Sequence, residues 1–305
     1  MPMTTSTWTK THSKLDYEPP FRQAADSSTW DWKQIFTVEN MGDHKGSQKL
    51  YYSHTSFGYA VERGELQGGY FEDMEELPAS TLTMVKYMLG TTLSYENEMD
   101  SIHIKDWLAR IGKGMGESHR QTRDAYVARL FNNGFDSTAQ AVWDSAAWFD
   151  SHTINSGDTV DNDLSPASFS YDSYWDMEKF LMYGMRTQKG LRVAGKGKWL
   201  VFSPAITDTV EKVFNSPGEP DKADRNANTL AKRKPILIPC QELSSTTPFF
   251  LLDERMKDYL IFINRESPKP EWQDDFVRDG RMCKTRNRFA AGVIDYMFAV
   301  GNPGA

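Results

Sequence analysis

The chain has only two cysteines among its 305 residues, Cys240 and Cys283. Two thiols are too few for a disulfide framework, and their spacing is not that of a metal site, which fits a reducing compartment. We expect Cys240, which follows an apolar stretch, to be buried and inert. A reactive thiol at Cys283 and a bridge between the two cysteines are the alternatives that the sequence leaves open.

Long apolar runs and an excess of positive charge are also missing. Eighteen consecutive apolar residues occur nowhere, so no membrane-spanning helix is predicted, and residues 1–17 lack the apolar core of a secretory signal. Lys and Arg number 35 against 42 Asp and Glu, a formal net charge of −7. Any contact with DNA is therefore expected to be weak and without sequence specificity.

The motifs of common enzyme classes are absent as well. The six histidines are scattered, without the paired spacing of a zinc hydrolase, and there is no G-x-S-x-G elbow. The glycines at 112–116 lack the spacing of a nucleotide-binding loop. We therefore predict no catalytic residue, no cofactor and no metal site, and a protein that is not an enzyme.

Two polar stretches could each be interpreted as a ligand-binding site. Asp158, Asp161 and Asp163 could hold a divalent cation, but the calcium-loop spacing is missing, so a solvated acidic loop is favoured over residues 150–163. The stretch Gly195–Lys198 could contact phosphates with its lysines, although a basic turn that enters a strand is favoured.

Aromatic residues are abundant. They make up 13% of the chain and supply rigid contact area of the kind enriched in cores and subunit interfaces. Residues 1–28 show neither helical nor strand periodicity and are expected to form an arm. The first apolar cluster follows them, at Trp30, Trp32, Ile35, Phe36 and Val38.

Residues 50–87 have a strand-like pattern interrupted by turn-prone glycines, with too few apolar residues for a core. A lone two-stranded ribbon is marginal in water, so this one is expected to rest on something else. Its middle is acidic, with Arg63 as the only basic residue against Glu62, Glu65, Glu72, Asp73, Glu75 and Glu76.

A long helix is predicted from an N-cap at Asp100 to Asn132, because apolar residues recur at spacings of three and four. The glycines at 112, 114 and 116 predict a kink or break in it, and Gly134 is expected in the left-handed conformation at its end. Further helices are predicted over 168–187 and 207–214, and strands over 199–204, 236–238, 249–252 and 259–263. Strands and a few helices without regular alternation indicate an α+β fold.

Ala125–Phe135, AYVARLFNNGF, is similar to the end of the spine helix in the major capsid proteins of tailed bacteriophages, especially the group that resembles the major head subunit of Mu-like phages. The aromatic pair, histidine and Leu-Ser helix start that follow in that group correspond to Trp148-Phe149, His152 and Leu164–Ser168. Lys198–Pro204, Phe249–Asp253 and Arg288–Val300 resemble its later strands. Each motif is weak alone, but their order along most of the chain is fairly specific.

The resemblance implies an α+β fold of the Hong Kong 97 type. Its parts would be an N-terminal arm at 1–47, an extended loop or hairpin at 48–86, a peripheral domain with the long spine helix at 87–145, a central axial domain at 146–255, and a return to the peripheral domain at 256–305. The loop residues expected at the subunit interface are Tyr59, Glu62, Arg63, Glu65, Tyr70, Phe71 and Glu72.

The function implied is that of a major capsid protein, which self-assembles into pentamers and hexamers of an icosahedral shell that encloses phage double-stranded DNA. The protein would be synthesised in the cytoplasm of the bacterial host and reside in the virion. Residues 1–28 are too short for the internal scaffolding segment that some relatives carry, so a separate scaffolding protein is expected, with portal and decoration proteins as further partners.

One departure from the family concerns covalent chemistry. The prototype of this fold cross-links its subunits through a lysine on the extended loop, whereas residues 50–85 contain no lysine here, so that cross-link is not expected. Two rival interpretations remain: a soluble enzyme whose site cannot be seen in the sequence, and another phage structural protein, such as a tail or decoration subunit, because a fold does not fix a role.

Overall fold

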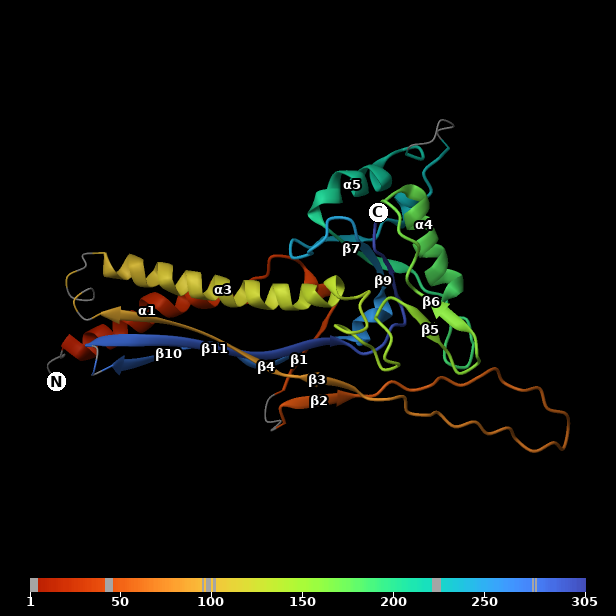
Figure 1. Cartoon of the computed structure of the whole chain (residues 1–305), viewed down its shortest axis with the longest axis horizontal. Coiled ribbons are helices and arrows are strands. Elements are labelled where there is room, and N and C mark those ends of the chain that lie inside the picture. The colour runs from red at the N-terminus through yellow and green to blue at the C-terminus, as the bar shows by residue number, and fades with distance from the viewer. Residues whose placement is uncertain are drawn as a thin grey trace.

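The computed structural model describes residues 5–41, 46–94, 96, 100, 103–220, 226–275, 277 and 279–305. A long flat part, in which two helices lie along a sheet, joins a triangular part that contains a second sheet, and a long loop extends beneath the triangular part in Figure 1. The predicted α+β mixture of helices and strands is confirmed. None of the helices in the described ranges is long and apolar enough to cross a membrane.

The long sheet has the strand order β1-β10-β11-β4. β10 (Leu260–Asp275) and β11 (Gly280–Val293) form its antiparallel centre, β4 (Val85–Ser94) pairs antiparallel with β11, and β1 (Thr37–Asn40) pairs parallel with β10. The strand predicted at 259–263 is only the start of β10. Beyond it β10 becomes half-buried and exposed, so no apolar run marks its remaining length.

Two helices lie along this sheet (Figure 1). α3 (Ile104–Asn132) ends where predicted but begins after His103 and not at Asp100. The break predicted at the glycines is absent, because α3 is one continuous helix. α1 (Thr5–Asp26) packs along α3, so the interpretation of this stretch as lacking helical structure is wrong, whereas its assignment to an arm stays a prediction.

The glycines of α3 are explained by this packing. A Cβ at Gly112 would lie 2.6 Å from the carbonyl oxygen of Tyr17, and one at Gly116 would lie 2.5 Å from that of Phe21. Glycine is therefore needed at both positions for the two backbones to approach. Tyr17 and Phe21 are fully buried there, and the Tyr17 hydroxyl donates to the sulfur of Met115 at 2.9 Å.

The second sheet has the order β12-β9-β7-β8. β7 (Gly197–Phe202), β8 (Ile236–Pro239) and β9 (Phe249–Asp253) confirm the three strands predicted there. β12 (Ala299–Asn302), the last strand, pairs with β9. The expectation that the last strands return to the peripheral part therefore fails for β12, whose four residues are all buried in the second sheet.

Short elements surround the second sheet. α5 (Thr207–Asn215) confirms a predicted helix. The helix predicted at 168–187 is shorter: α4 (Tyr171–Lys179) is capped by Ser170 and continues as a π-helical turn at Phe180–Gly184. The solvated loop predicted at 150–163 instead contains a hairpin of β5 (Ser151–Thr153) and β6 (Thr159–Asp161), because His152 and Val160 are buried. Short 3₁₀ turns lie at Trp32–Gln34, Pro204–Ile206, Leu230–Arg233 and Glu254–Asp258.

An aromatic cluster joins the end of α3 to the second sheet. The ring of Phe131 lies 5.1 Å from Trp148 and 5.3 Å from Phe250, and Trp148 stacks on Phe149 at 4.4 Å. Gly134 is not in the left-handed conformation, contrary to prediction. It is required for another reason, since a Cβ there would lie 2.8 Å from the ring of Phe149.

Candidate functional site

The extended loop, residues 52–79, begins from a short ladder between β2 (Gln48–Tyr51) and β3 (Ser80–Thr83). Beyond this ladder, the Thr55 N–H donates to the Glu75 carbonyl at 2.9 Å and the Leu77 N–H to the Ser53 carbonyl at 2.8 Å. Thr55 is fully buried, and its hydroxyl accepts from the Glu75 N–H. The predicted ribbon is thus paired only near its base, and its arms run on without strand pairing (Figure 1).

The base of the loop is firmly attached to the long sheet. Glu39 on β1 accepts a hydrogen bond from the Tyr51 hydroxyl at 2.6 Å and forms an ion pair with Lys49. Partial burial alone would raise the pKa of Glu39, but these two donors lower it below its ordinary value. Leu82 on β3 lies over Gly292 of β11, where a Cβ would be 2.2 Å from its side chain. The direction in which the loop leaves the body is therefore fixed.

The tip of the loop is exposed almost throughout, and the expectation that it rests on another surface stays a prediction. Tyr59 is 76% exposed and Phe71 is 92% exposed, while Tyr70 is about half exposed. The guanidinium of Arg63 lies 5.7 Å from the ring of Tyr70, so these two predicted tip residues contact each other. Glu62 and Glu65 are exposed, and neither forms an ion pair with another described residue.

Glu72 differs from the other predicted interface residues because it is already bound within the subunit. It accepts from the Gly58 N–H on the opposite arm at 2.9 Å and pairs with Lys189 at 3.2 Å. The hydrogen bond from Gly58 and the ion pair with Lys189 lower the pKa of Glu72. Its role is thus to tie the two arms together and to rest them on the turn at 187–190. Nothing local in the sequence marks Lys189 as its partner.

Sequence reasoning missed further exposed apolar side chains on the loop. Phe57 and Met74 are about half exposed on the two arms, and Leu66 is fully exposed at the turn, where its φ is +66°. A leucine in the left-handed region is uncommon and is costly unless something offsets it. The available signal was the placement of leucine inside a turn-prone acidic stretch.

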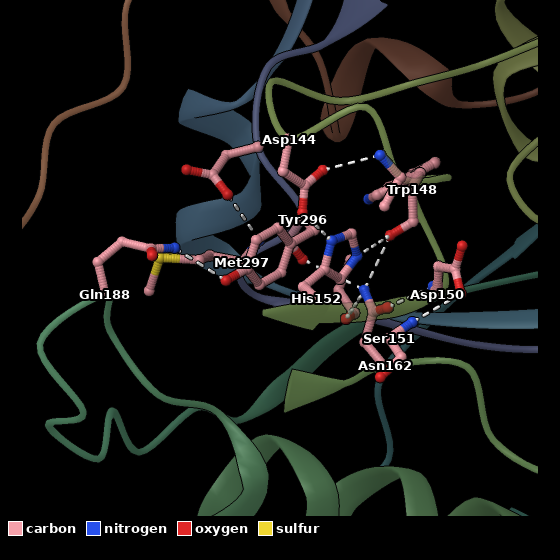
Figure 2. A network of polar contacts seen from close by, with 12 residues as sticks. Asp144, Trp148, Asp150, Ser151, His152, Asn162, Gln188, Tyr296 and Met297 are labelled. Atoms are coloured by element: carbon pink, nitrogen blue, oxygen red, sulfur yellow. Dashed lines mark hydrogen bonds and ion pairs between the residues drawn. The ribbon is translucent and has the colours of Figure 1, made fainter. Parts of the chain in front are cut away.

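A buried polar network tests the rival interpretation of an enzyme (Figure 2). His152 is fully buried, its Nδ1 lies 2.7 Å from Asp144, and its ring stacks on Tyr296 with 3.7 Å between centroids. The second nitrogen, Nε2, lies 3.3 Å from the Trp148 carbonyl oxygen. Both ring nitrogens are thus occupied by packing partners, which indicates a structural role for this pair.

Asn162, the residue after β6, completes the network. Its amide nitrogen donates to the carbonyl oxygens of Trp148 at 3.0 Å and Ala299 at 3.3 Å, and Gln188 donates to the Tyr296 hydroxyl at 3.0 Å. Figure 2 shows these side chains converging from separate segments of the triangular part. They hold the β5–β6 hairpin to the segment from Tyr296 to the first residue of β12, Ala299.

The remaining candidates from the sequence are buried or unclustered. Cys240 and Cys283 are both buried and unpaired. Burial raises the pKa of Cys240 to about 12 and that of Cys283 above its ordinary value, so neither thiol is primed to react. Among the described residues no group of three or more His, Cys, Asp and Glu side chains could hold a metal ion.

Comparison with known proteins identifies related folds. The model of a family described as phage capsid protein matches residues 78–302. No curated protein matches the sequence. Among solved structures, a chain of Mycobacterium phage Adephagia is similar at 11% identity and a TM-score of 0.55, covering 100% of this chain and 99% of that one.

Two further structures give the same result. A chain of the virus-like particle from Pyrococcus furiosus is 8% identical with a TM-score of 0.57, over 94% of this chain and 98% of that one. A chain of the bacteriophage PhiM1 mature capsid is 11% identical with a TM-score of 0.56, over 90% and 86%. These likenesses concern the fold, and they confirm the predicted α+β architecture of the Hong Kong 97 type.

Proposed function

The chain belongs to the family of phage capsid proteins, and we propose that its copies bind head to tail into five- and six-membered rings that close an icosahedral shell around phage DNA. It is thus a major capsid protein and a component of the virion. The family match over most of the chain carries this conclusion. Head-to-tail contacts use two different surfaces of each subunit, so rings arise when the rotation between subunits closes.

The extended loop is the first of these two surfaces. Each arm of roughly 14 residues spans at most about 45 Å, long enough to lie across a neighbouring subunit. The side chains at its tip have no core of their own, and Leu66 and Phe71 are almost fully exposed. Exposed apolar groups that are gathered on one segment are typical of a surface that another protein covers. We place Tyr59, Tyr70 and Phe71 in the subunit interface.

The proposed division of the chain follows the predicted domains. The arm at 1–47, the loop at 48–86, the peripheral part at 87–145 with its return at 256–305, and the axial part at 146–255 are assigned on the resemblance, except that β12 (Ala299–Asn302) lies in the second sheet and goes with the axial part. Partners proposed on the same ground are separate scaffolding, portal and decoration proteins. Because the chain has a net charge of −7, we propose that it contacts the packaged DNA weakly and without sequence specificity. Synthesis takes place in the cytoplasm of the bacterial host.

The double substitution Tyr70→Ala, Phe71→Ala tests the role of the loop. Burying a large apolar side chain contributes about 1.5–3 kcal/mol, so losing both weakens each contact by on the order of 3 kcal/mol. That corresponds to roughly a hundredfold lower association constant. Negative-stain electron microscopy and size-exclusion chromatography of the full chain measure the yield of rings and shells.

The matched control is Tyr183→Ala, which removes an aromatic ring of similar exposure outside the loop. We expect the control to assemble like the wild type and the double variant to stay as free subunits. Shells from the double variant in wild-type yield would contradict the role of the loop. A wild-type chain that forms only a small stable oligomer with no ring or shell would contradict the proposed function itself.

A further inference from the structure

A basic groove lies at the end of the second sheet where β7 and β8 begin and β9 ends. It has a volume of about 730 Å³. Its lining contains two acidic residues, Asp253 and Glu254, and six basic ones, which are Lys196, Lys198, Lys232, Arg233, Lys234 and Arg255. In a chain of net charge −7, this concentration of positive charge stands out.

The two carboxylates of the groove are already engaged. Asp253 accepts from the Arg255 guanidinium at 2.9 Å and from the Lys196 N–H at 2.6 Å. Partial burial alone would raise the pKa of Asp253, but these donors lower it below its ordinary value. Glu254 forms an ion pair with Lys198. The acidic residues therefore shape the turn at 195–198 and leave the groove basic.

Two of the lysines keep free ammonium groups. Lys196 and Lys232 are exposed, and no acidic side chain within the described ranges pairs with either. By contrast, Arg233 pairs with the buried Glu178 at 3.1 Å, and Lys234 donates to Asn215 at 3.1 Å. The groove thus presents the positive charges of Lys196 and Lys232, while its other basic side chains are held in place by hydrogen bonds and ion pairs within the subunit.

The tip of the extended loop has the complementary charge. Glu62, Glu65, Asp73 and Glu75 are exposed and have no ion-pair partner in the part of the chain that the structure describes. Within the same subunit Glu72 pairs with Lys189, whereas these four carboxylates remain available for an ion pair with a second subunit. Both the loop tip and the groove also carry an exposed apolar side chain. It is Phe71 on the loop and Ile236, which is 44% exposed, in the groove lining.

We infer that the basic groove is the docking site for the acidic tip of the extended loop from a second copy of this chain. This inference rests on the proposed function, to which it adds the receiving surface. Lys196 and Lys232 meet Glu62 and Glu65, while Ile236 packs against the apolar side chains of the tip. Complementary charges of this kind set the register and speed the encounter of two subunits.

Charge reversal tests this pairing with the full chain. The groove variant is Lys196→Glu, Lys232→Glu and the loop variant is Glu62→Lys, Glu65→Lys. Each variant alone brings like charges together, so we expect each to lower the association constant by about tenfold or more. Analytical ultracentrifugation over a range of salt concentrations, with electron microscopy of the products, measures association.

Mixing the two variants provides the decisive measurement. In an alternating ring, the basic loop of one variant meets the acidic groove of the other, and the remaining contacts are wild-type, so equal mixing restores association into six-membered rings. The control Lys105→Glu, Lys113→Glu changes the net charge of the chain as much as the groove variant does, with both residues on the exposed side of α3. We expect it to associate like the wild type.

Three results would overturn the inference or its premise, and they are distinguishable. If the groove variant assembles normally but its shells hold less DNA, the groove binds nucleic acid and the inference is wrong. If each variant fails alone and mixing does not rescue them, the two surfaces do not meet. If the wild type does not associate at any salt concentration while remaining folded, the proposed function fails as well.

Discussion

The packing of α1 on α3 gives a prediction with a built-in control. Gly116→Ala would place a Cβ 2.5 Å from the Phe21 carbonyl oxygen, 2.9 Å from the Ala24 Cβ and 3.1 Å from the Ala25 nitrogen. Backbone atoms cannot move aside as a flexible side chain can, so α1 must shift or detach. Gly114→Ala, two residues away on the same helix, meets nothing within 4 Å.

The two substitutions should therefore have opposite signs. Replacing glycine by alanine inside a helix stabilises it by about 1 kcal/mol, which is the full expected effect at Gly114. At Gly116 the same gain is outweighed by overpacking, which costs about 1–3 kcal/mol. If α1 detaches, the loss is larger, because burial of Tyr17 and Phe21 contributes about 1.5–3 kcal/mol each. We expect the variants to differ by on the order of 3 kcal/mol in the free energy of unfolding.

Urea unfolding of the unassembled subunit measures this difference, and limited proteolysis reports whether α1 stays docked. The fluorescence of Trp272 is a local probe of α1 docking, since its ring lies 5.2 Å from that of Tyr17 in an edge-to-face arrangement. The Gly116 variant should lose protection of α1 from protease, whereas the Gly114 variant should keep it. Equal stability and equal protection of the two variants would refute the close-packing explanation of these glycines.

Two further predictions concern the triangular part. Burial and the neighbouring Asp161 and Asp150 raise the pKa of Asp163 to about 6. The protonated carboxyl therefore favours folding, and this stability is lost as the pH rises from about 4 to about 6. Asp163→Asn should flatten the pH dependence of the free energy of unfolding in that window, and an unchanged slope would contradict the assignment. Asp144→Ala leaves the Nδ1 of the buried His152 without its hydrogen-bond partner and should cost about 1–3 kcal/mol by the same measurement, whereas an unchanged free energy of unfolding would contradict a structural role for this hydrogen bond.

The strands of the second sheet could be predicted because their residues are buried on both faces. Leu200, Val201 and Phe202 are consecutive, apolar and almost completely inaccessible, so a short apolar run in the sequence marks the strand directly. The β5–β6 hairpin shows the opposite case. Its stability depends on His152 and Asn162, whose partners, Tyr296 and Ala299, are distant in the sequence. A polar stretch that is buried by distant partners has no local signature.

The helix α1 was missed because two signals conflicted. Tyr17, Phe21 and Ala25 recur every four residues, which is a helical pattern, but Pro19 and Pro20 lie between them and are typical of a helix end. The glycines of α3 were misread for a related reason. Their cost in an isolated helix is visible in the sequence, whereas the backbone of α1 that they accommodate is not. Packing between α1 and α3 therefore explains both why residues 5–26 are helical and why α3 contains glycines.

The exposed loop could be predicted in outline because sparse apolar residues among carboxylates cannot form a core. The same composition explains how such a loop avoids premature association. Leu66 and Phe71 are exposed enough to attach to any apolar surface, but Glu62, Glu65 and Asp73 repel the acidic loops of other free subunits. A surface that receives the tip must therefore be basic as well as apolar. The groove around Lys196, Lys232 and Ile236 meets both conditions, so the charge pattern that keeps free subunits apart also selects the contact that joins them.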